Sequence, residues 1–288
     1  MNALKTISFC FCFLYILNPV LAKERKIIKN VSYVDSSAAD YSEKEHILDI
    51  YIPKNVQKNA KVLVFIHGGA WKNGSKDTPR HTAVGKAFSH NGLITVVINY
   101  RLKLGTKYYD MAKDCARAVV WVEKNIHKHG GDNNEIYVSG HSSGAHLAAL
   151  ISTDSSYLID SGFHHRIKGC ILNDAFGLNM FNYMATGNPV DILLFHATFT
   201  DLPSEWQKAS PFYHVNKDET RYYMIYGGKT MQTVIDGSIE FNERNRYVGN
   251  ISHIHKVKLR AHIPMLNLFC NKRNKELKKV LVYIGQIK

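Results

Sequence analysis

The chain has 288 residues, of which 45% are hydrophobic, so it is long and apolar enough to bury one sizeable core. Its formal net charge is +13, and lysines and arginines gather in residues 23–29 and 271–279. No nucleic-acid-binding motif, phosphate-cradling loop or interleaving of basic and aromatic residues accompanies this charge. That argues against a nucleic-acid partner and leaves attraction to acidic polymers as an alternative.

The first 22 residues have the pattern of a secretory signal peptide. Lys5 precedes an apolar run from Ile7 to Leu17, and Val20-Leu21-Ala22 fits a small-x-small cleavage site. The run is shorter than the roughly 20 residues that a helix needs to span a bilayer. We therefore expect residues 1–22 to be removed and the remainder, 23–288, to be secreted or periplasmic without a stable membrane anchor. An uncleaved signal anchor is the alternative.

Removal of this leader would leave three cysteines, Cys115, Cys170 and Cys270. An odd number at wide spacing matches neither a disulfide framework nor a zinc-binding motif. We interpret all three as small buried side chains, with one disulfide as the alternative in an oxidising compartment. No metal and no cofactor is expected.

Short β-branched runs alternate with helical patterns along residues 23–288, and no linker or repeat divides them. Strands are predicted at 46–52, 61–69, 93–102, 135–140, 167–176, 221–228 and 255–262. Helices are predicted at 108–130, between the strand at 221–228 and about residue 246, and at the C-terminus. The stretch from the end of the strand at 167–176 to about residue 220 is predicted to be irregular. Continuous apolar strands separated by helices indicate the α/β class, with a mostly parallel sheet covered by helices on both faces. In such sheets the functional residues gather at the carboxyl ends of the strands.

Ser142 is the candidate nucleophile. It is the central residue of Gly140-His-Ser-Ser-Gly144, which follows a predicted strand and precedes a helix. This context is typical of a nucleophile elbow, in which the serine lies at a strained turn and the flanking glycines let strand and helix approach closely.

A nucleophilic serine needs amide donors where negative charge develops on the substrate. The segment His67-Gly-Gly-Ala-Trp71 directly follows a predicted strand and carries small side chains that leave its backbone accessible. We predict an oxyanion hole formed by the N–H groups of Gly69, Ala70 and Ser143.

Five segments carry a family resemblance: His-Gly-Gly-Ala-Trp at 67–71, Ile-Asn-Tyr-Arg-Leu at 98–102, Asp114 with Ala118 and Trp121, the run 130–150, and Ala-Ser-Pro-Phe-Tyr-His-Val at 209–215. Together they resemble the α/β-hydrolase-fold esterases and the kynurenine formamidase-like enzymes, from about residue 45 to the C-terminus. The resemblance implies that fold, a Ser-His-acid triad, and action on carboxylic esters or small amides.

The same resemblance places the catalytic base after the last strand, where His262 precedes a helix. His253 and His255 are alternatives. They would lie before or at the start of the last predicted strand, at the opposite edge of the sheet from Ser142. We therefore favour His262.

The acid departs from the family pattern, because Thr230 stands where the resemblance places a carboxylate after the penultimate strand. A threonine hydroxyl can orient an imidazole but cannot stabilise its charged form. Two carboxylates could substitute: Asp174, at the end of the preceding strand, and Asp236, in the following helix. We favour Asp174, for which a turn-capping role is the structural alternative.

The aromatic-rich segment 177–211 is long for a connection, and we expect a short lid or pocket wall over Ser142. The predicted function is a serine esterase that acts on small-molecule esters through an acyl-enzyme. Two alternatives are kept: an arylformamidase-like amide hydrolase, and a hydrolase-fold binding protein without turnover, which Thr230 motivates.

Overall fold

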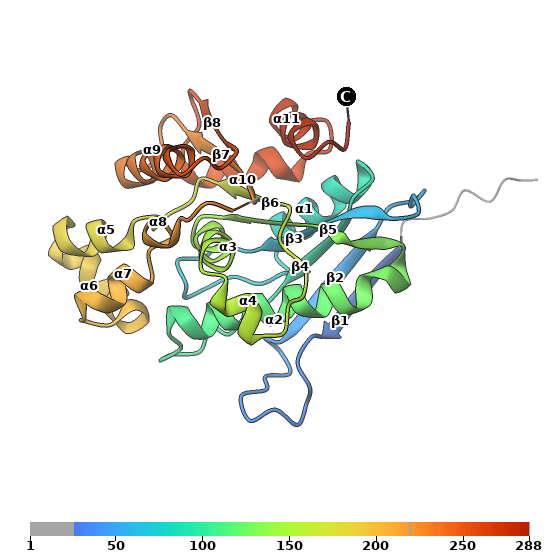
Figure 1. Cartoon of the computed structure of the whole chain (residues 1–288), viewed down its shortest axis with the longest axis horizontal. Helices are drawn as coiled ribbons and strands as arrows, with labels where there is room; N and C mark the ends of the chain where they lie inside the picture. Colours follow the sequence, from blue (N-terminus) through green and yellow to red (C-terminus); the bar gives the residue numbers. More distant parts are fainter. Residues whose placement is uncertain (1–25, 219, 288) are drawn as a thin grey trace, which may run out of the picture.

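A computed structural model describes residues 26–218 and 220–287, and its core is one twisted sheet (Figure 1). Within these residues eight strands lie in the order β1-β2-β4-β3-β5-β6-β7-β8. Strand β2 pairs antiparallel with β1 and β4, and the other neighbours pair parallel. The predicted mostly parallel sheet is therefore confirmed. The strands are β1 Lys26–Ser32, β2 Ile47–Ile52, β3 Ala60–Ile66, β4 Ile94–Ile98, β5 Gly131–His141, β6 Gly169–Asn173, β7 Arg221–Gly227 and β8 Ser252–Val257.

Helices cover both faces of the sheet, as predicted. Alternate residues of β3 point to opposite sides: Val62 and Val64 pack in the core with α2, α3 and α9, whereas Leu63 and Phe65 pack in a second core with α1, α10 and α11. The helices are α1 Pro79–His90, α2 Tyr108–Asn125, η1 Ile126–His129, α3 Ser143–Thr153, α4 Ser156–Asp160, α5 Met180–Thr186, α6 Pro189–Phe199, α7 Pro203–Lys208, α8 Pro211–His214, α9 Gln232–Tyr247, α10 His262–Cys270 and α11 Lys275–Tyr283.

Three local predictions need correction. Residues 26–32, where the sequence analysis predicted no strand, form the edge strand β1, and its two lysines face solvent and discourage pairing with another chain. The last strand ends at Val257 rather than 262, because the N–H of Arg260 donates to the Val257 carbonyl and turns the chain. The stretch predicted as irregular contains the four short helices α5 to α8, which lie together at the left of Figure 1.

The predicted signal peptide, residues 1–22, lies outside the described residues. Among the residues that are described, no helix combines the length and the apolar character that a membrane crossing requires.

Candidate active site

Five neighbouring strands bring the candidate residues to one edge of the sheet. The loop 67–71 follows β3, Ser142 follows β5, Asp174 follows β6, Thr230 follows β7, and His262 begins the helix after β8. Strands β3, β5, β6, β7 and β8 are consecutive in the sheet, and all run in the same direction. Residues far apart in the sequence therefore meet at the carboxyl ends of the strands.

Ser142 occupies a strained turn between β5 and α3. Its φ of 56° and ψ of −125° lie outside the regions that a residue with a side chain normally adopts. A Cβ added to Gly140 would lie 2.3 Å from the Gly144 carbonyl carbon, and one added to Gly144 would lie 2.2 Å from the Ile66 oxygen. Only glycine fits at either position, which is the steric requirement predicted for this motif.

The side chains of Ser142, His262 and Asp174 form a continuous chain of hydrogen bonds. The Ser142 Oγ lies 2.8 Å from His262 Nε2, and His262 Nδ1 lies 2.6 Å from Asp174 Oδ2. A carboxylate can only accept, so Nδ1 carries the proton and Nε2 is free to accept the serine hydroxyl proton. Asp174 is fully buried, and the His262 side chain is 18% exposed.

Thr230 supports Asp174 instead of replacing it. The Thr230 hydroxyl donates to Asp174 Oδ2 at 2.5 Å, and the Gly227 N–H donates to Oδ1 at 2.7 Å. These two hydrogen bonds hold the buried carboxylate in a fixed orientation beside His262. The alternative acid, Asp236, is exposed and accepts from Gln232 within α9, at 2.8 Å. The structure thus brings Asp174, and not Asp236, to His262.

The two alternative histidines lie in β8 and contact α11. His255 Nε2 is 2.8 Å from the Glu276 carboxylate, and the His253 ring packs against Tyr283 at a centroid distance of 5.6 Å. Within the described residues neither side chain hydrogen-bonds to Ser142. His262 is therefore the histidine that the fold places beside the serine.

The loop after β3 lies against the nucleophile. Gly69 has a φ of 139° and Ala70 a φ of 54°, an unusual run of positive values that turns this backbone sharply. Both residues line the cavity that also contains Ser142, and Ser143 is the first residue of α3. The neighbouring Gly68 is so close that an added Cβ would lie 3.2 Å from the Ser142 Cβ. This placement is compatible with the predicted oxyanion donors, whose role stays a prediction.

Trp71 anchors this loop to the helices around it. Its Nε1–H donates to His146 Nδ1 at 3.3 Å, and the Nε2–H of His146 donates to the Ala209 carbonyl at 2.7 Å. The Trp71 ring meets Phe199 edge-on at 4.8 Å. Burial lowers the pKa of His146 to about 4, so the neutral form needed for both bonds persists at neutral pH. The tryptophan of the motif thus serves to position the loop, a role that the sequence analysis did not assign.

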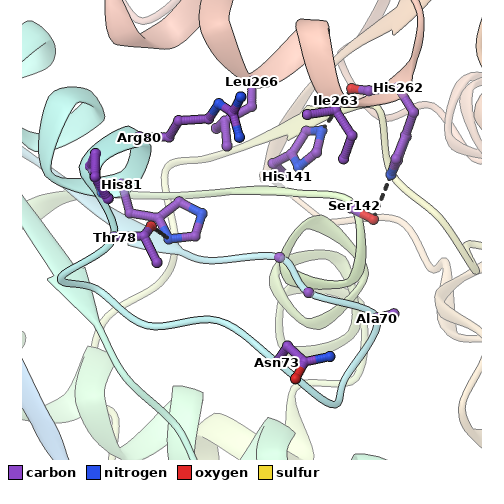
Figure 2. Close-up of a pocket in the computed structure, with 13 residues that line it drawn as sticks. Ala70, Asn73, Thr78, Arg80, His81, His141, Ser142, His262, Ile263 and Leu266 are labelled. Atoms are coloured by element: carbon purple, nitrogen blue, oxygen red, sulfur yellow. Dashed lines mark hydrogen bonds between the residues drawn. The ribbon is translucent and has the colours of Figure 1, made fainter.

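A cavity of about 740 Å³ opens beside Ser142 (Figure 2). Sequence reasoning missed several of its lining residues, because they belong to the start of α1 and to α10. The lining consists of Gly68, Gly69, Ala70, Asn73, Thr78, Pro79, Arg80, His81, His141, Ser142, His262, Ile263 and Leu266. None of these lies in 177–211, so a lid formed by that segment stays a prediction.

His141 holds the backbone of the candidate base. Its Nε2–H donates to the His262 carbonyl at 3.1 Å, and the two rings lie 4.9 Å apart. Burial, with a smaller contribution from His262, lowers the pKa of His141 to about 4. The ring is therefore neutral at pH 7 and places no positive charge beside His262.

The described residues include no group of three or more His, Cys, Asp or Glu side chains placed to hold a metal ion. The chemistry available at this site is that of a serine, a histidine, a buried carboxylate and backbone amides.

Comparison with known proteins identifies the family. The sequence profile of BD-FAE matches residues 48–244, well over half of the chain. The chain belongs to the BD-FAE family. The members of this family are α/β-hydrolase esterases, so the family and fold predicted from the sequence are confirmed.

Relatives of this BD-FAE chain carry esterase names. It is 27% identical over 214 residues to esterase LipC of Mycobacterium tuberculosis (strain ATCC 25618 / H37Rv), covering 70% of this chain and 52% of the relative. It is 33% identical over 125 residues to a probable isoprenylcysteine alpha-carbonyl methylesterase of Oryza sativa subsp. japonica, covering 43% and 28% respectively. The chain spans about half or less of the length of these curated relatives. The predicted enzyme class, carboxylic ester hydrolase, agrees with their names.

Solved structures share the fold of the BD-FAE chain. A truncated carbohydrate esterase from gut microbiota aligns with a TM-score of 0.76 and 20% identity over 93% of this chain and 99% of the other. Esterase B from Lactobacillus Rhamnosis aligns with a TM-score of 0.72 and 15% identity, over 92% and 85%. At such identities the likeness concerns the fold alone.

Two residues of the family segments, Arg101 and Asp114, have a structural role in the BD-FAE chain. Asp114 is fully buried in α2 and accepts two hydrogen bonds from the Arg101 guanidinium, at 2.7 and 2.8 Å. His46 Nε2 lies 3.1 Å from the same carboxylate. This paired charge ties the loop after β4 to α2, and none of the three residues lines the cavity at Ser142.

Proposed function

We propose that the protein is a serine esterase that hydrolyses carboxylic esters of small or medium-sized substrates through an acyl-enzyme. The observation that carries this proposal is the hydrogen-bonded chain from the Ser142 hydroxyl through His262 to the buried Asp174 carboxylate. In this arrangement the imidazole is in the tautomer that can remove the serine proton. The names of the relatives support ester hydrolysis as the reaction.

In the first half of the reaction, Ser142 Oγ attacks the ester carbonyl carbon and His262 Nε2 takes the hydroxyl proton. The backbone N–H groups of Gly69, Ala70 and Ser143 stabilise the oxyanion that forms. When the bond between the carbonyl carbon and the alcohol oxygen breaks, His262 returns the proton to the departing alcohol. Asp174 stabilises the transient imidazolium from its buried position.

In the second half, a water molecule replaces the alcohol. His262 takes one of its protons while the oxygen attacks the acyl carbon, and the proton then returns to Ser142 as the carboxylic acid leaves. The cavity of about 740 Å³ is of the size that accommodates small and medium-sized ligands. We therefore propose short to medium esters as substrates.

A fluorophosphonate probe tests the proposal, because it reacts only with an activated serine. The wild-type protein is expected to be labelled and Ser142→Ala is not, while the variant keeps the wild-type circular dichroism spectrum. Ser139→Ala is a matched control, because Ser139 is a buried serine of β5, the strand before Ser142, and does not line the cavity. Equal labelling of Ser142→Ala would remove Ser142 from the mechanism.

Two alternatives remain distinguishable. The binding-protein alternative rested on the absence of a carboxylate at Thr230, and the 2.6 Å contact between Asp174 and His262 favours an enzyme instead. An arylformamidase-like activity uses the same groups on an amide, but export would separate the protein from cytosolic tryptophan catabolism. Parallel assays with p-nitrophenyl butyrate and N-formylkynurenine decide which substrate class has the higher kcat/KM.

We further propose that residues 1–22 direct export and that the mature protein is secreted or periplasmic. The apolar run after Lys5 and the small residue at the cleavage site support this. N-terminal sequencing of the exported protein is expected to begin near Lys23. Recovery of a membrane-held chain that still begins at Met1 would contradict it.

A further inference from the structure

The cavity beside Ser142 has an uneven charge distribution. Among the described residues that line it, Arg80 is the one permanently charged side chain, and none is a carboxylate. The two lining histidines besides His262 are neutral at pH 7, because burial lowers the pKa of His141 to about 4 and also lowers that of His81. A ligand in this cavity therefore meets a positive charge with no negative charge in the lining to balance it.

The Arg80 side chain is held in place without being neutralised. Its Nε–H donates to the Asn267 Oδ1 of α10 at 3.2 Å, and among residues 26–218 and 220–287 no side chain hydrogen-bonds to the terminal nitrogens of the guanidinium. The Arg80 carbonyl also accepts from the Cys270 thiol, at 3.3 Å, so backbone and side chain both dock on α10. Within the described residues no carboxylate forms an ion pair with this guanidinium. Figure 2 shows the side chain extending from α1 toward Leu266 of α10.

The position of Arg80 does not serve the stability of its own helix. It is in the first turn of α1, which contains no acidic residue, and Thr78 provides no side-chain cap. The helix dipole disfavours a positive charge at this end. Arg80 therefore serves the contact with α10 and the lining of the cavity rather than the stability of α1.

We propose that Arg80 is a specificity-determining residue and that the preferred ester carries a carboxylate, which the Arg80 guanidinium binds while the ester carbonyl lies at Ser142. This inference rests on the proposed esterase function and names the substrate class for the same site. A planar guanidinium can pair with a carboxylate through two parallel hydrogen bonds. The net charge of +13 further favours the approach of an acidic substrate.

Half esters of dicarboxylic acids provide the direct test. Monomethyl succinate, glutarate, adipate and suberate carry the carboxylate at increasing distance from the ester, and each has a neutral counterpart of the same shape in which an amide replaces the carboxylate. Methanol release measured by NMR gives kcat and KM for each member of a pair, and p-nitrophenyl butyrate serves as a neutral reference. Arg80 is exposed, so solvent limits the expected preference for the acid to about two- to fivefold in kcat/KM at its best chain length.

Two Arg80 variants and a control separate charge from shape. Arg80→Gln is expected to bring the acid-to-amide ratio of kcat/KM close to one, with the change mainly in KM, because the ion pair forms in the ground state and the transition state alike. Arg80→Lys keeps the charge without the fork and is expected to retain part of the preference. Lys86→Gln removes an exposed charge from the same helix outside the cavity and is expected to keep the wild-type ratio.

The outcomes distinguish this inference from the function on which it rests. A wild-type protein that cleaves p-nitrophenyl butyrate but shows no preference for any half ester over its amide would overturn the role of Arg80 and leave the esterase intact. An equal loss on acid and amide in Arg80→Gln would do the same. If Ser142 is not labelled by fluorophosphonate and no ester is cleaved, both proposals are wrong.

Discussion

Replacing Asp174 with asparagine tests the assignment of the acid through the hydrogen-bonding pattern around it. In the native structure Oδ1 accepts from the Gly227 N–H and Oδ2 accepts from both Thr230 and His262. An asparagine must point its oxygen at the Gly227 N–H, since the opposite orientation would place two donors face to face. Its NH₂ group then faces His262 Nδ1 and favours the tautomer that carries its proton on Nε2.

That tautomer cannot accept the proton of Ser142, whose Oγ lies 2.8 Å from Nε2. The substitution also removes the buried negative charge that stabilises the imidazolium. The corresponding change in a serine protease lowers kcat by about 10⁴, and each tenfold step is about 1.4 kcal/mol, so Asp174→Asn is expected to raise the barrier by about 5 kcal/mol.

The assay is the hydrolysis of p-nitrophenyl butyrate, followed at saturating substrate with the folded state checked by circular dichroism. Asp236→Asn is the matched control, because that carboxylate is exposed and contacts Gln232 rather than His262. It is expected to keep wild-type kcat. A folded Asp174→Asn protein with kcat within about threefold of wild type would refute the tautomer argument, and a large loss in Asp236→Asn alone would move the acid to α9.

Three further outcomes are expected. Thr230→Val should lower kcat by about tenfold, because valine removes a charge-assisted hydrogen-bond donor to Asp174. Thr230→Ser keeps the hydroxyl and should have a kcat close to wild type. If the kcat of Thr230→Val equals that of the wild type, the hydroxyl is dispensable. Folding keeps His141 and His146 neutral, with each pKa lowered to about 4 from about 6.5 in the unfolded chain, so stability is full above pH 6.5 and falls as the pH drops toward 4. Urea unfolding at pH 8 and 4.5 should differ by about 2–3 kcal/mol for each ring, and a flat profile would contradict their burial. Gly144→Ala should lower the free energy of unfolding by about 3 kcal/mol or abolish folding, because the added Cβ would lie 2.2 Å from the Ile66 oxygen. A variant with wild-type stability would argue against the close contact of α3 with β3.

Local patterns in the sequence were sufficient to predict the α/β class and the position of Ser142 in a turn between a strand and a helix. Apolar runs such as residues 61–66 are buried strands whatever their neighbours are, and Gly140 and Gly144 reflect contacts within one strand-turn-helix unit. Edge strands were harder to predict. In β1 and β8 one face meets solvent and carries lysine or histidine, so the hydrophobic signal weakens and the bounds shift.

Which candidate carboxylate lies beside His262 was decided by the tertiary structure. Asp174 and Thr230 both follow strands. His262 begins a helix more than thirty residues beyond Thr230, and the spacing along the chain does not show which of the two side chains reaches its imidazole. The answer depends on β6, β7 and β8 being neighbours in the sheet and on the 2.5 Å bond that lets Thr230 support Asp174. Strand order and register are set by long-range packing, so a local pattern can identify candidates but only the assembled sheet selects among them. The same reason explains why Arg80, brought to the cavity by the contact between α1 and α10, has no signature in the sequence.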